Sequence, residues 1–308
     1  MAPSAEMPIT GEVTAIVKVN LRQGAPSVRA PVLRKLGAQT TIPVVALAVG
    51  DNVQGNPHWY RTSDNAYAWA GAFSSLEVTD STPVPAPITP SDPNVNLNKI
   101  PLVVDLFHGD GVASFDQAYA AGLRGIIHKA TTGTSGVDDA YASRRTEALK
   151  AGLLWGAYHW GTAASVSDQV SNFLRIADPD PKTTLVALDF ETDVGNQMTL
   201  EGAREFLGLI SDRLNRKAIL YSGDVAKAAL GKKNDPFFGS HRLWLAQYNN
   251  TPSVQRSWKT YWLWQYTDGS ANTPGRKTVP GIPGDRSNRL DCNYFAGTAD
   301  DLKSQWAS

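Results

Sequence analysis

Residues 184–191 read TLVALDFE, an apolar run that ends in two acidic residues, Asp189 and Glu191. A short apolar run of this kind is typical of a strand that is buried on both faces, as in a parallel sheet. Residues i and i+2 of a strand point to the same side and lie about 6–7 Å apart between their Cα atoms. We therefore expect the two carboxylates to enter the same space together.

Similar apolar runs recur through residues 100–308, and helix-type segments lie between them. The longest of these segments opens with Thr199 as its expected N-cap. This alternation predicts an α/β fold, a (β/α)8-type TIM-like barrel. There is little room for a helix between residues 248 and 261, so we expect irregularity in the last strands. The eight expected strands span residues 100–107, 125–130, 153–160, 184–191, 217–222, 243–248, 261–266 and 289–295.

The first part of the chain has a different pattern. Residues 9–79 read as short β-type runs broken by Gly, Pro, Asn and Asp, which predicts a small all-β barrel. Five prolines follow within residues 83–93, and such a stretch is typical of an extended, semi-rigid spacer. The sequence thus predicts an all-β domain over residues 1–81, a Pro-rich linker over 82–99 and a barrel domain over 100–308.

Charge and cysteine content exclude several classes of function. Residues 1–81 hold six basic and six acidic side chains and residues 100–308 hold 22 of each, so neither part carries the positive field that nucleic acid would require. The one cysteine, Cys292, cannot form an intrachain disulfide, and zinc-ligand spacings are absent. We expect no metal, no organic cofactor and a monomer.

Targeting signals are also missing from the sequence. The first twelve residues lack the basic start and apolar stretch of a secretory signal, and no apolar run is long enough to cross a bilayer. We therefore expect no membrane insertion. Export would follow phage-type lysis, injection into competitors, or removal of an earlier signal.

In a parallel barrel, the active site gathers at the carboxyl ends of the strands. Carboxylates, amides and aromatic rings that converge there are typical of a sugar-binding cleft, in which rings stack on sugars and carboxylates transfer protons. The polar residues at the ends of the expected strands are Asp105, Tyr158, His159, Trp160, Asp189, Glu191, Tyr221, Gln247, Tyr248, Gln265, Tyr266, Asp291 and Asn293.

Asp189 and Glu191 have the sharpest chemical implication. Two like charges so close together raise one pKa, which keeps a Glu protonated near neutral pH and makes it a usable general acid. The alternative is a solvated loop that pairs with other charges. Their position directly after LVAL favours the catalytic interpretation.

Residues 100–306 resemble glycoside hydrolase family 25, the Chalaropsis-type lysozymes. The segments that carry the resemblance are VVDLFHG, GIIHKATTG, AGLLWGAYHW, LVALDFE, LWLAQY, LWQYTD and LDCNYFAGT, in the family's order. The resemblance implies an N-acetylmuramidase that hydrolyses the β-1,4 bond between N-acetylmuramic acid and N-acetylglucosamine of bacterial peptidoglycan. Catalysis would be retaining and assisted by the substrate's acetamido group.

The resemblance also implies roles for individual residues. Glu191 would be the acid/base and Asp189 its partner, and Asp105 and Asp291 would complete the set of cleft carboxylates. The residues expected to position sugars are Tyr158, Trp160, Tyr221, Gln247, Tyr248 and Gln265. Two departures from the family pattern are LFHGDG after the opening strand and His128 before Lys129.

Residues 9–79 resemble a bacterial Src-homology-3-like wall-binding domain, on VNLRQGAPS, the strand Pro31–Leu36, His58-Trp59-Tyr60 and Ala68-Trp69-Ala70. Trp59 and Trp69 are either core residues or ligand contacts. Two alternatives to a muramidase are a chitinase-like family 18 hydrolase and a non-catalytic wall-binding protein. The first usually has a longer acidic run before its Asp-x-Glu, and the second does not require all four carboxylates.

Overall fold

The computed structural model describes residues 6–53, 56–73, 77–78 and 95–308. The chain divides into two compact units, Met1–Ala86 and Pro87–Ser308. Most of the predicted Pro-rich linker, residues 82–94, lies outside the described residues.

The first unit is a single seven-stranded sheet in the order β3-β2-β6-β5-β4-β1-β7, with antiparallel neighbours. The long strand β4 alternates buried and exposed residues, and its Ile42, Val44, Ala46 and Ala48 enter the core. Trp59 is also buried, with Nε1 donating to the Asp51 carbonyl oxygen at 2.9 Å. The all-β content is confirmed, but in the described residues the strands form an open sheet with β3 and β7 at its edges, and not the predicted closed barrel. The Src-homology-3 likeness stays a prediction. The elements are β1 (Glu6–Thr14), β2 (Val19–Gln23), β3 (Val32–Leu36), β4 (Thr41–Val53), β5 (Asn56–Arg61), β6 (Ala66–Trp69), η1 (Ala70–Ala72) and β7 (Glu77–Val78).

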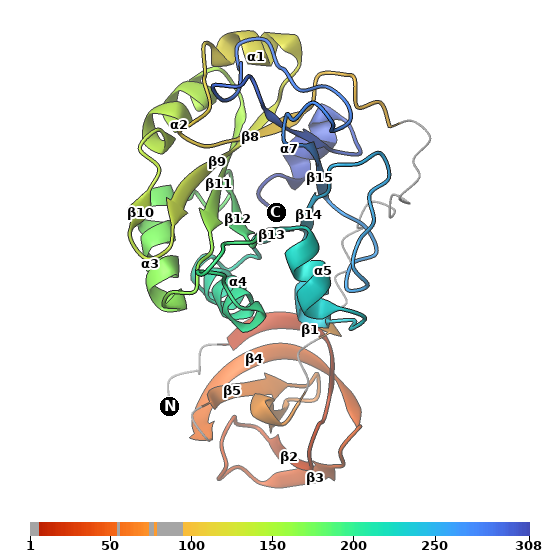
Figure 1. Ribbon diagram of the computed structural model, residues 1–308. Helices are drawn as coiled ribbons and strands as arrows, with labels where there is room; N and C mark the ends of the chain where they lie inside the picture. The colour runs from red at the N-terminus through yellow and green to blue at the C-terminus, as the bar shows by residue number, and fades with distance from the viewer. Residues whose placement is uncertain (1–5, 54–55, 74–76, 79–94) are drawn as a thin grey trace. The chain divides into compact units, whose positions relative to one another are not determined.

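The second unit is a closed barrel of eight strands, in which β8 pairs with both β9 and β16 (Figure 1). All eight strands expected from the sequence are present. A short strand, β10 (Gly136–Val137), adds to the outer end of β9. The barrel strands are β8 (Val103–Leu106), β9 (Gly125–Thr132), β11 (Leu154–Trp160), β12 (Leu185–Asp189), β13 (Ile219–Ser222), β14 (Leu243–Ala246), β15 (Leu263–Thr267) and β16 (Asp291–Tyr294).

The last strand departs from a regular (β/α)8 barrel. The first seven barrel strands, β8, β9 and β11 to β15, are parallel, whereas β16 is antiparallel to both of its neighbours. The described residues 268–290, between β15 and β16, contain no helix, so this segment does not cross back to the start of the barrel. The sequence predicts irregularity here but not the reversed direction.

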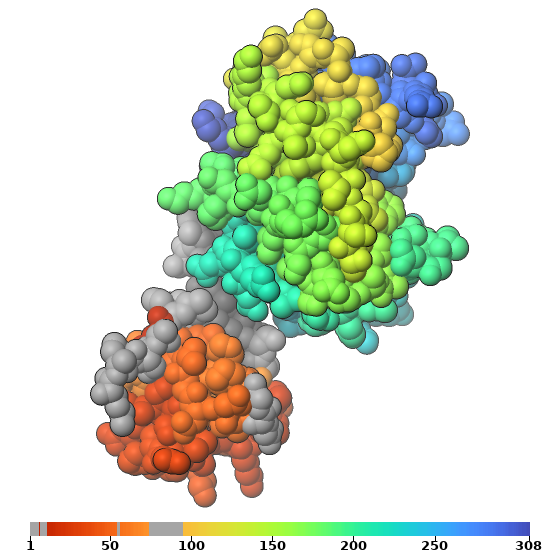
Figure 2. Space-filling model, turned by 90° about the vertical axis from the view of Figure 1, so that its left-hand side faces the viewer, coloured from red at the N-terminus to blue at the C-terminus, as the bar shows by residue number. Residues whose placement is uncertain are grey.

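Helices cover the outside of the barrel. α2, α3 and α4 pack against β9, β11 and β12, and Figure 2 shows α1 to α3, in yellow to green, forming one continuous outer surface. Thr199 caps α4 as predicted, because its side chain accepts from the Gly202 amide at 3.0 Å. None of the helices in the described residues has the length and apolar composition needed to cross a membrane. The helices are α1 (Phe115–Ala121), α2 (Tyr141–Lys150), α3 (Val166–Ala177), α4 (Leu200–Leu214), α5 (Asp224–Leu230), α6 (Pro236–Gly239) and α7 (Ala299–Gln305).

The barrel interior explains why its carboxylates point inward. Leu185 and Ala187 of β12 are buried in an inner cluster with Val103, Ile127 and Ile219. Because side chains alternate along a strand, Asp189 continues the inward row that Leu185 and Ala187 begin. The apolar cluster thus forms the floor beneath the polar end of the barrel.

Candidate active site

A cleft of about 240 Å³ opens at the carboxyl ends of the parallel strands. The structure brings all four predicted carboxylates into its lining, together with three of the six predicted sugar-contacting residues. The lining residues are Asp105, Phe107, Lys129, Tyr158, Trp160, Asp189, Glu191, Tyr221, Trp244 and Asp291.

The register of the parallel strands places these residues at one level. Asp189 is the Cα partner of Trp160 on one side and of Tyr221 on the other, and Tyr221 in turn pairs with Trp244. The Phe190 amide donates to the Tyr221 carbonyl oxygen at 2.9 Å, so β12 stays attached to β13 beyond its last residue. Glu191 therefore follows Asp189 into the cleft on an anchored backbone.

Asp189 is buried with an unused acceptor. Its side chain is 4% exposed, and Oδ1 has no hydrogen-bond partner among the residues that the structure describes. Burial raises the pKa of Asp189 well above its usual value, and the negative charge of Glu191 adds to this rise, while Lys129 opposes it. An oriented acceptor of this kind can bind a donor group of a ligand.

Glu191 lies in the same cleft and is half-buried. Burial raises the pKa of its carboxyl group, and the positive charge of Lys129 opposes that rise. The Lys129 Nζ itself lies over the Trp160 ring, 4.7 Å from its centroid. A carboxyl group whose pKa is raised in this way is suited to donate a proton near neutral pH.

Asp105 has hydrogen-bond donors on both of its oxygens. Gln265 Nε2 lies 3.0 Å from each oxygen, and Asn293 Nδ2 donates to Oδ2 at 2.7 Å. Burial raises the pKa of Asp105 from 3.8 to about 6 against the opposing effect of these hydrogen bonds. The neighbouring Asp291 has its pKa raised well above the usual value, first by burial and then by the charge of Asp105.

The remaining predicted sugar contacts lie elsewhere. Gln265 is 1% exposed and lies beneath the cleft, and the hydroxyl of Tyr248, a residue that is 38% exposed, donates to Gln265 Oε1 at 2.8 Å. Gln247 accepts from Lys227 Nζ at 2.8 Å and does not line the cleft. Their roles in substrate binding stay predictions.

Sequence reasoning did not select Phe107, Lys129 and Trp244 as cleft residues. Phe107 stands two positions after Asp105. Trp244 lies within its strand, and the sequence argument considered only the polar residues at the end of that strand, Gln247 and Tyr248. A search of the i±2 neighbours of each strand-end residue would have found Phe107.

The two departures from the family pattern belong to one hydrogen-bonded unit. Arg144 Nη1 donates to the Phe107 carbonyl oxygen at 2.8 Å and to His128 Nε2 at 3.0 Å, and Nη2 donates to the Asp110 carbonyl oxygen. Asp110 also accepts from the Phe107 amide at 2.8 Å. The unusual loop after β8 and the unusual His128 therefore support each other through Arg144.

One group among the described residues has the donor set of a metal site. Ligand atoms of His108, Asp138 and Asp139 lie within 4.8 Å of one another. The hydrogen bond of 3.0 Å between His108 Nδ1 and Asp138 Oδ2 accounts for this proximity, and the backbone amides of His108 and Ala140 also bind Asp138. The group does not line the cleft, and no catalytic role is assigned to it.

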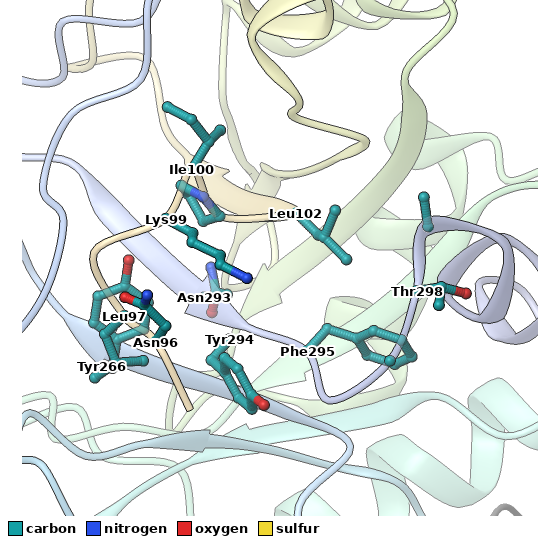
Figure 3. A pocket seen from close by; sticks show the side chains of 13 residues that line it. Asn96, Leu97, Lys99, Ile100, Leu102, Tyr266, Asn293, Tyr294, Phe295 and Thr298 are labelled. Carbon is teal, nitrogen blue, oxygen red and sulfur yellow. The ribbon is translucent and has the colours of Figure 1, made fainter. Parts of the chain in front are cut away.

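A second cavity of about 320 Å³ lies beside the segment that precedes β8 and the residues that follow β16 (Figure 3). Leu97, Lys99, Tyr294 and Phe295 are among its lining residues. Its lining includes no carboxylate, so this larger cavity lacks the acid and base that glycoside hydrolysis requires.

Comparisons with known proteins agree on the barrel unit. Residues 104–275 match the model of the family described as Glycosyl hydrolases family 25. Lysozyme M1 from Streptomyces globisporus is 26% identical over 211 residues, covering 64% of this chain and 68% of that protein.

Solved structures share the fold. A bacterial lysozyme from Streptomyces coelicolor, 24% identical, superposes with a TM-score of 0.57 over 66% of this chain and 95% of its own. A muramidase from Trichobolus zukalii, 25% identical, gives a TM-score of 0.54 over 66% of this chain and 97% of its own.

Proposed function

The chain belongs to glycosyl hydrolases family 25, whose model matches more than half of it, and from this premise we propose that it is a peptidoglycan-degrading N-acetylmuramidase. The bond cleaved is the β-1,4 bond between N-acetylmuramic acid and N-acetylglucosamine. The observation that carries the proposal is the pair Asp189 and Glu191, which lies in a cleft with two further carboxylates.

In this mechanism, Glu191 is the general acid and then the general base. It protonates the glycosidic oxygen as the bond to the anomeric carbon breaks, and afterwards it removes a proton from the attacking water. Burial supports the first step, because it raises the pKa of Glu191 and so favours the protonated form.

Asp189 orients the nucleophile. The oxygen of the substrate's 2-acetamido group attacks the anomeric carbon and forms a cyclic intermediate, which water then opens with retention of configuration. Asp189 accepts a hydrogen bond from the acetamido N–H and thereby polarises the acetamido group. Support for this role comes from Oδ1, which lacks a hydrogen-bond partner within the described part of the chain.

The other cleft residues set the charge and shape of the site. Asp105 and Asp291 stabilise the cationic transition state when they are ionised, and Tyr158 and Trp160 offer ring faces on which sugars can stack.

Analysis of the digestion products tests the bond specificity. Purified sacculi are digested, the new reducing ends are labelled by borohydride reduction, and the products are identified by mass spectrometry. A muramidase leaves reduced muramic acid. Reduced glucosamine would show a glucosaminidase and free stem peptides an amidase, and either product overturns the proposal.

We further propose that the first unit binds the bacterial cell wall and raises the local concentration of substrate. A protein limited to residues 95–308 should keep its turnover on short soluble fragments and lose about tenfold or more on sacculi. Equal loss on both substrates would instead make the first unit part of the active site. The proposed place of action is the cell wall, in the periplasm or outside the cell.

A further inference from the structure

A chain of buried hydrogen bonds crosses the floor of the cleft, and one end fixes its direction. Trp244 Nε1 donates to Asn293 Oδ1 at 2.6 Å, and an indole N–H can only donate. The amide nitrogen of Asn293 must therefore face the other way, where it donates to Asp105 Oδ2 at 2.7 Å. Asp105 acts as an acceptor in this chain.

Gln265 continues the chain with an orientation that Asp105 imposes. Its Nε2 donates to both oxygens of Asp105, each at 3.0 Å. Its Oε1 consequently faces Tyr221 and Tyr248, whose hydroxyls both donate to it at 2.8 Å. The amide of Gln265 is thus fully engaged within the protein, and its side chain is 1% exposed.

The Tyr221 hydroxyl has one proton, and three oxygens lie near it: Gln265 Oε1, Glu191 Oε1 and the Tyr248 hydroxyl, whose own proton goes to Gln265 Oε1. The Tyr221 hydroxyl lies 2.8 Å from Gln265 Oε1 and 3.3 Å from Glu191 Oε1. Gln265 Oε1 has no proton to offer, so the shorter bond requires Tyr221 to donate to it. The Tyr221 oxygen then presents a lone pair to Glu191, which suits a protonated carboxyl group and disfavours a carboxylate.

We propose that Gln265 is a positioning residue that turns Tyr221 into an acceptor for the acid proton of Glu191. This inference rests on the proposed role of Glu191 as general acid. Gln265 holds the Tyr221 proton away from Glu191, so Glu191 keeps its own proton until the glycosidic oxygen takes it. Gln265 touches no substrate in this role and acts through Tyr221.

Other charged and titratable groups also face Glu191 and must be held constant in a test. These groups are Asp189 on β12, Lys129 on β9, Asp105 on β8, Asp291 on β16 and Tyr248 after β14. The Tyr221→Phe variant changes none of them and removes one oxygen from the site.

The sign of one pKa change tests the proposal. The full chain is labelled with [δ-¹³C]glutamate, and the Glu191 signal is assigned by its absence in Glu191→Gln. If Tyr221 accepts from Glu191, Tyr221→Phe lowers the pKa of Glu191 by about half a unit or more. If Tyr221 donates to the carboxylate, the same variant raises that pKa. A rise, or no change, overturns the proposal.

A double-mutant cycle tests the part played by Gln265. Gln265→Met frees the Tyr221 proton to turn toward Glu191, so it should lower the pKa of Glu191 more in the parent than in Tyr221→Phe. Equal changes in both backgrounds overturn the role of Gln265. Tyr248→Phe is the comparison variant, because it removes the other hydroxyl on the same oxygen but leaves the bond between Tyr221 and Gln265, so it should shift the pKa of Glu191 less than Gln265→Met does.

This titration needs no substrate, so the two proposals can fail separately. If Glu191→Gln remains active, the function proposed for Glu191 is wrong, whatever the sign at Tyr221→Phe. If Glu191→Gln is inactive, the pKa of the alkaline limb of kcat/KM in Tyr221→Phe should shift in the same direction as the pKa of Glu191 measured by NMR. A limb that stays in place while KM rises would make Tyr221 a substrate contact only and would overturn the positioning role.

Discussion

Asp105 and Asp189 line the same cleft from two different strands, β8 and β12, and are buried to nearly the same degree, 6% and 4% exposed. Asp105 accepts three hydrogen bonds from two buried amides. Asp189 Oδ1 accepts none from any residue that the structure describes. Burial alone therefore does not distinguish a carboxylate that holds the protein together from one that waits for a ligand.

The difference separates two kinds of contribution. A buried acceptor with all its donors stabilises the fold, and loss of the carboxylate leaves those donors unsatisfied. A buried acceptor without a partner lowers stability and is retained where a substrate group will satisfy it. Asp105 belongs to the first kind, and we assign Asp189 to the second.

The largest expected effect is at Glu191, two residues after Asp189. Glu191→Gln should fold normally and lose about 10²–10⁴ in rate on peptidoglycan, because an amide cannot donate the required proton. Lysis is measured by the fall in turbidity of purified sacculi. Glu147→Gln, at an exposed position on α2, is the control and should lyse like the parent. Activity of Glu191→Gln within threefold of the parent would contradict the assignment.

Asp189→Asn should lose about 10²–10³ in rate, the usual effect of removing one group that stabilises charge in a transition state. Its free energy of unfolding should stay level or rise, because the substitution removes an unpaired buried carboxylate. Turnover and urea denaturation measure the two effects. A loss of stability together with activity would place Asp189 in the same class as Asp105 and end the distinction.

Asp105→Asn should lower the free energy of unfolding by about 1–3 kcal/mol, because the new amide faces the donors of Gln265 and Asn293. Urea denaturation at pH 7 measures this change against Asp189→Asn as the matched substitution. The comparison fails if the two variants are equally stable.

The smallest effect concerns Asp110, whose pKa is raised by burial from 3.8 to about 7. The folded protein thus binds this proton more tightly than the unfolded chain. The resulting stability is complete below about pH 4 and is lost as the pH rises through about 7. Asp110→Asn should flatten the fall in stability between pH 6 and 8 by about 1–2 kcal/mol. Denaturation curves across that range measure the slope, and an unchanged slope would be inconsistent with this pKa.

The barrel and its carboxylates could be predicted from sequence because both follow from local patterns. LVAL is long enough for one buried strand, and the residues that end such strands meet at one face. The network beneath the cleft could not be predicted in the same way. Gln265 meets Asp105 across 160 residues of sequence, and no spacing rule indicates which strand-end amide turns to a carboxylate and which turns to a sugar.

The direction of β16 was also beyond the sequence pattern. A run such as RLDCNYF predicts a strand but not which neighbour it approaches or from which end. The direction follows from the helix-free segment 268–290, which keeps the chain at the carboxyl end of the barrel.

The place of β16 in the barrel also determines when activity can appear during synthesis. Asn293, which binds Asp105, is translated 188 residues after it, and β16 is the strand that closes the gap between β15 and β8. A nascent chain without this strand has an open barrel and lacks one of the two amides that hold Asp105. Contacts this distant in sequence form late in folding. We therefore expect a chain that stops before β16 to be unable to cut a glycan, even though it already contains Asp189 and Glu191.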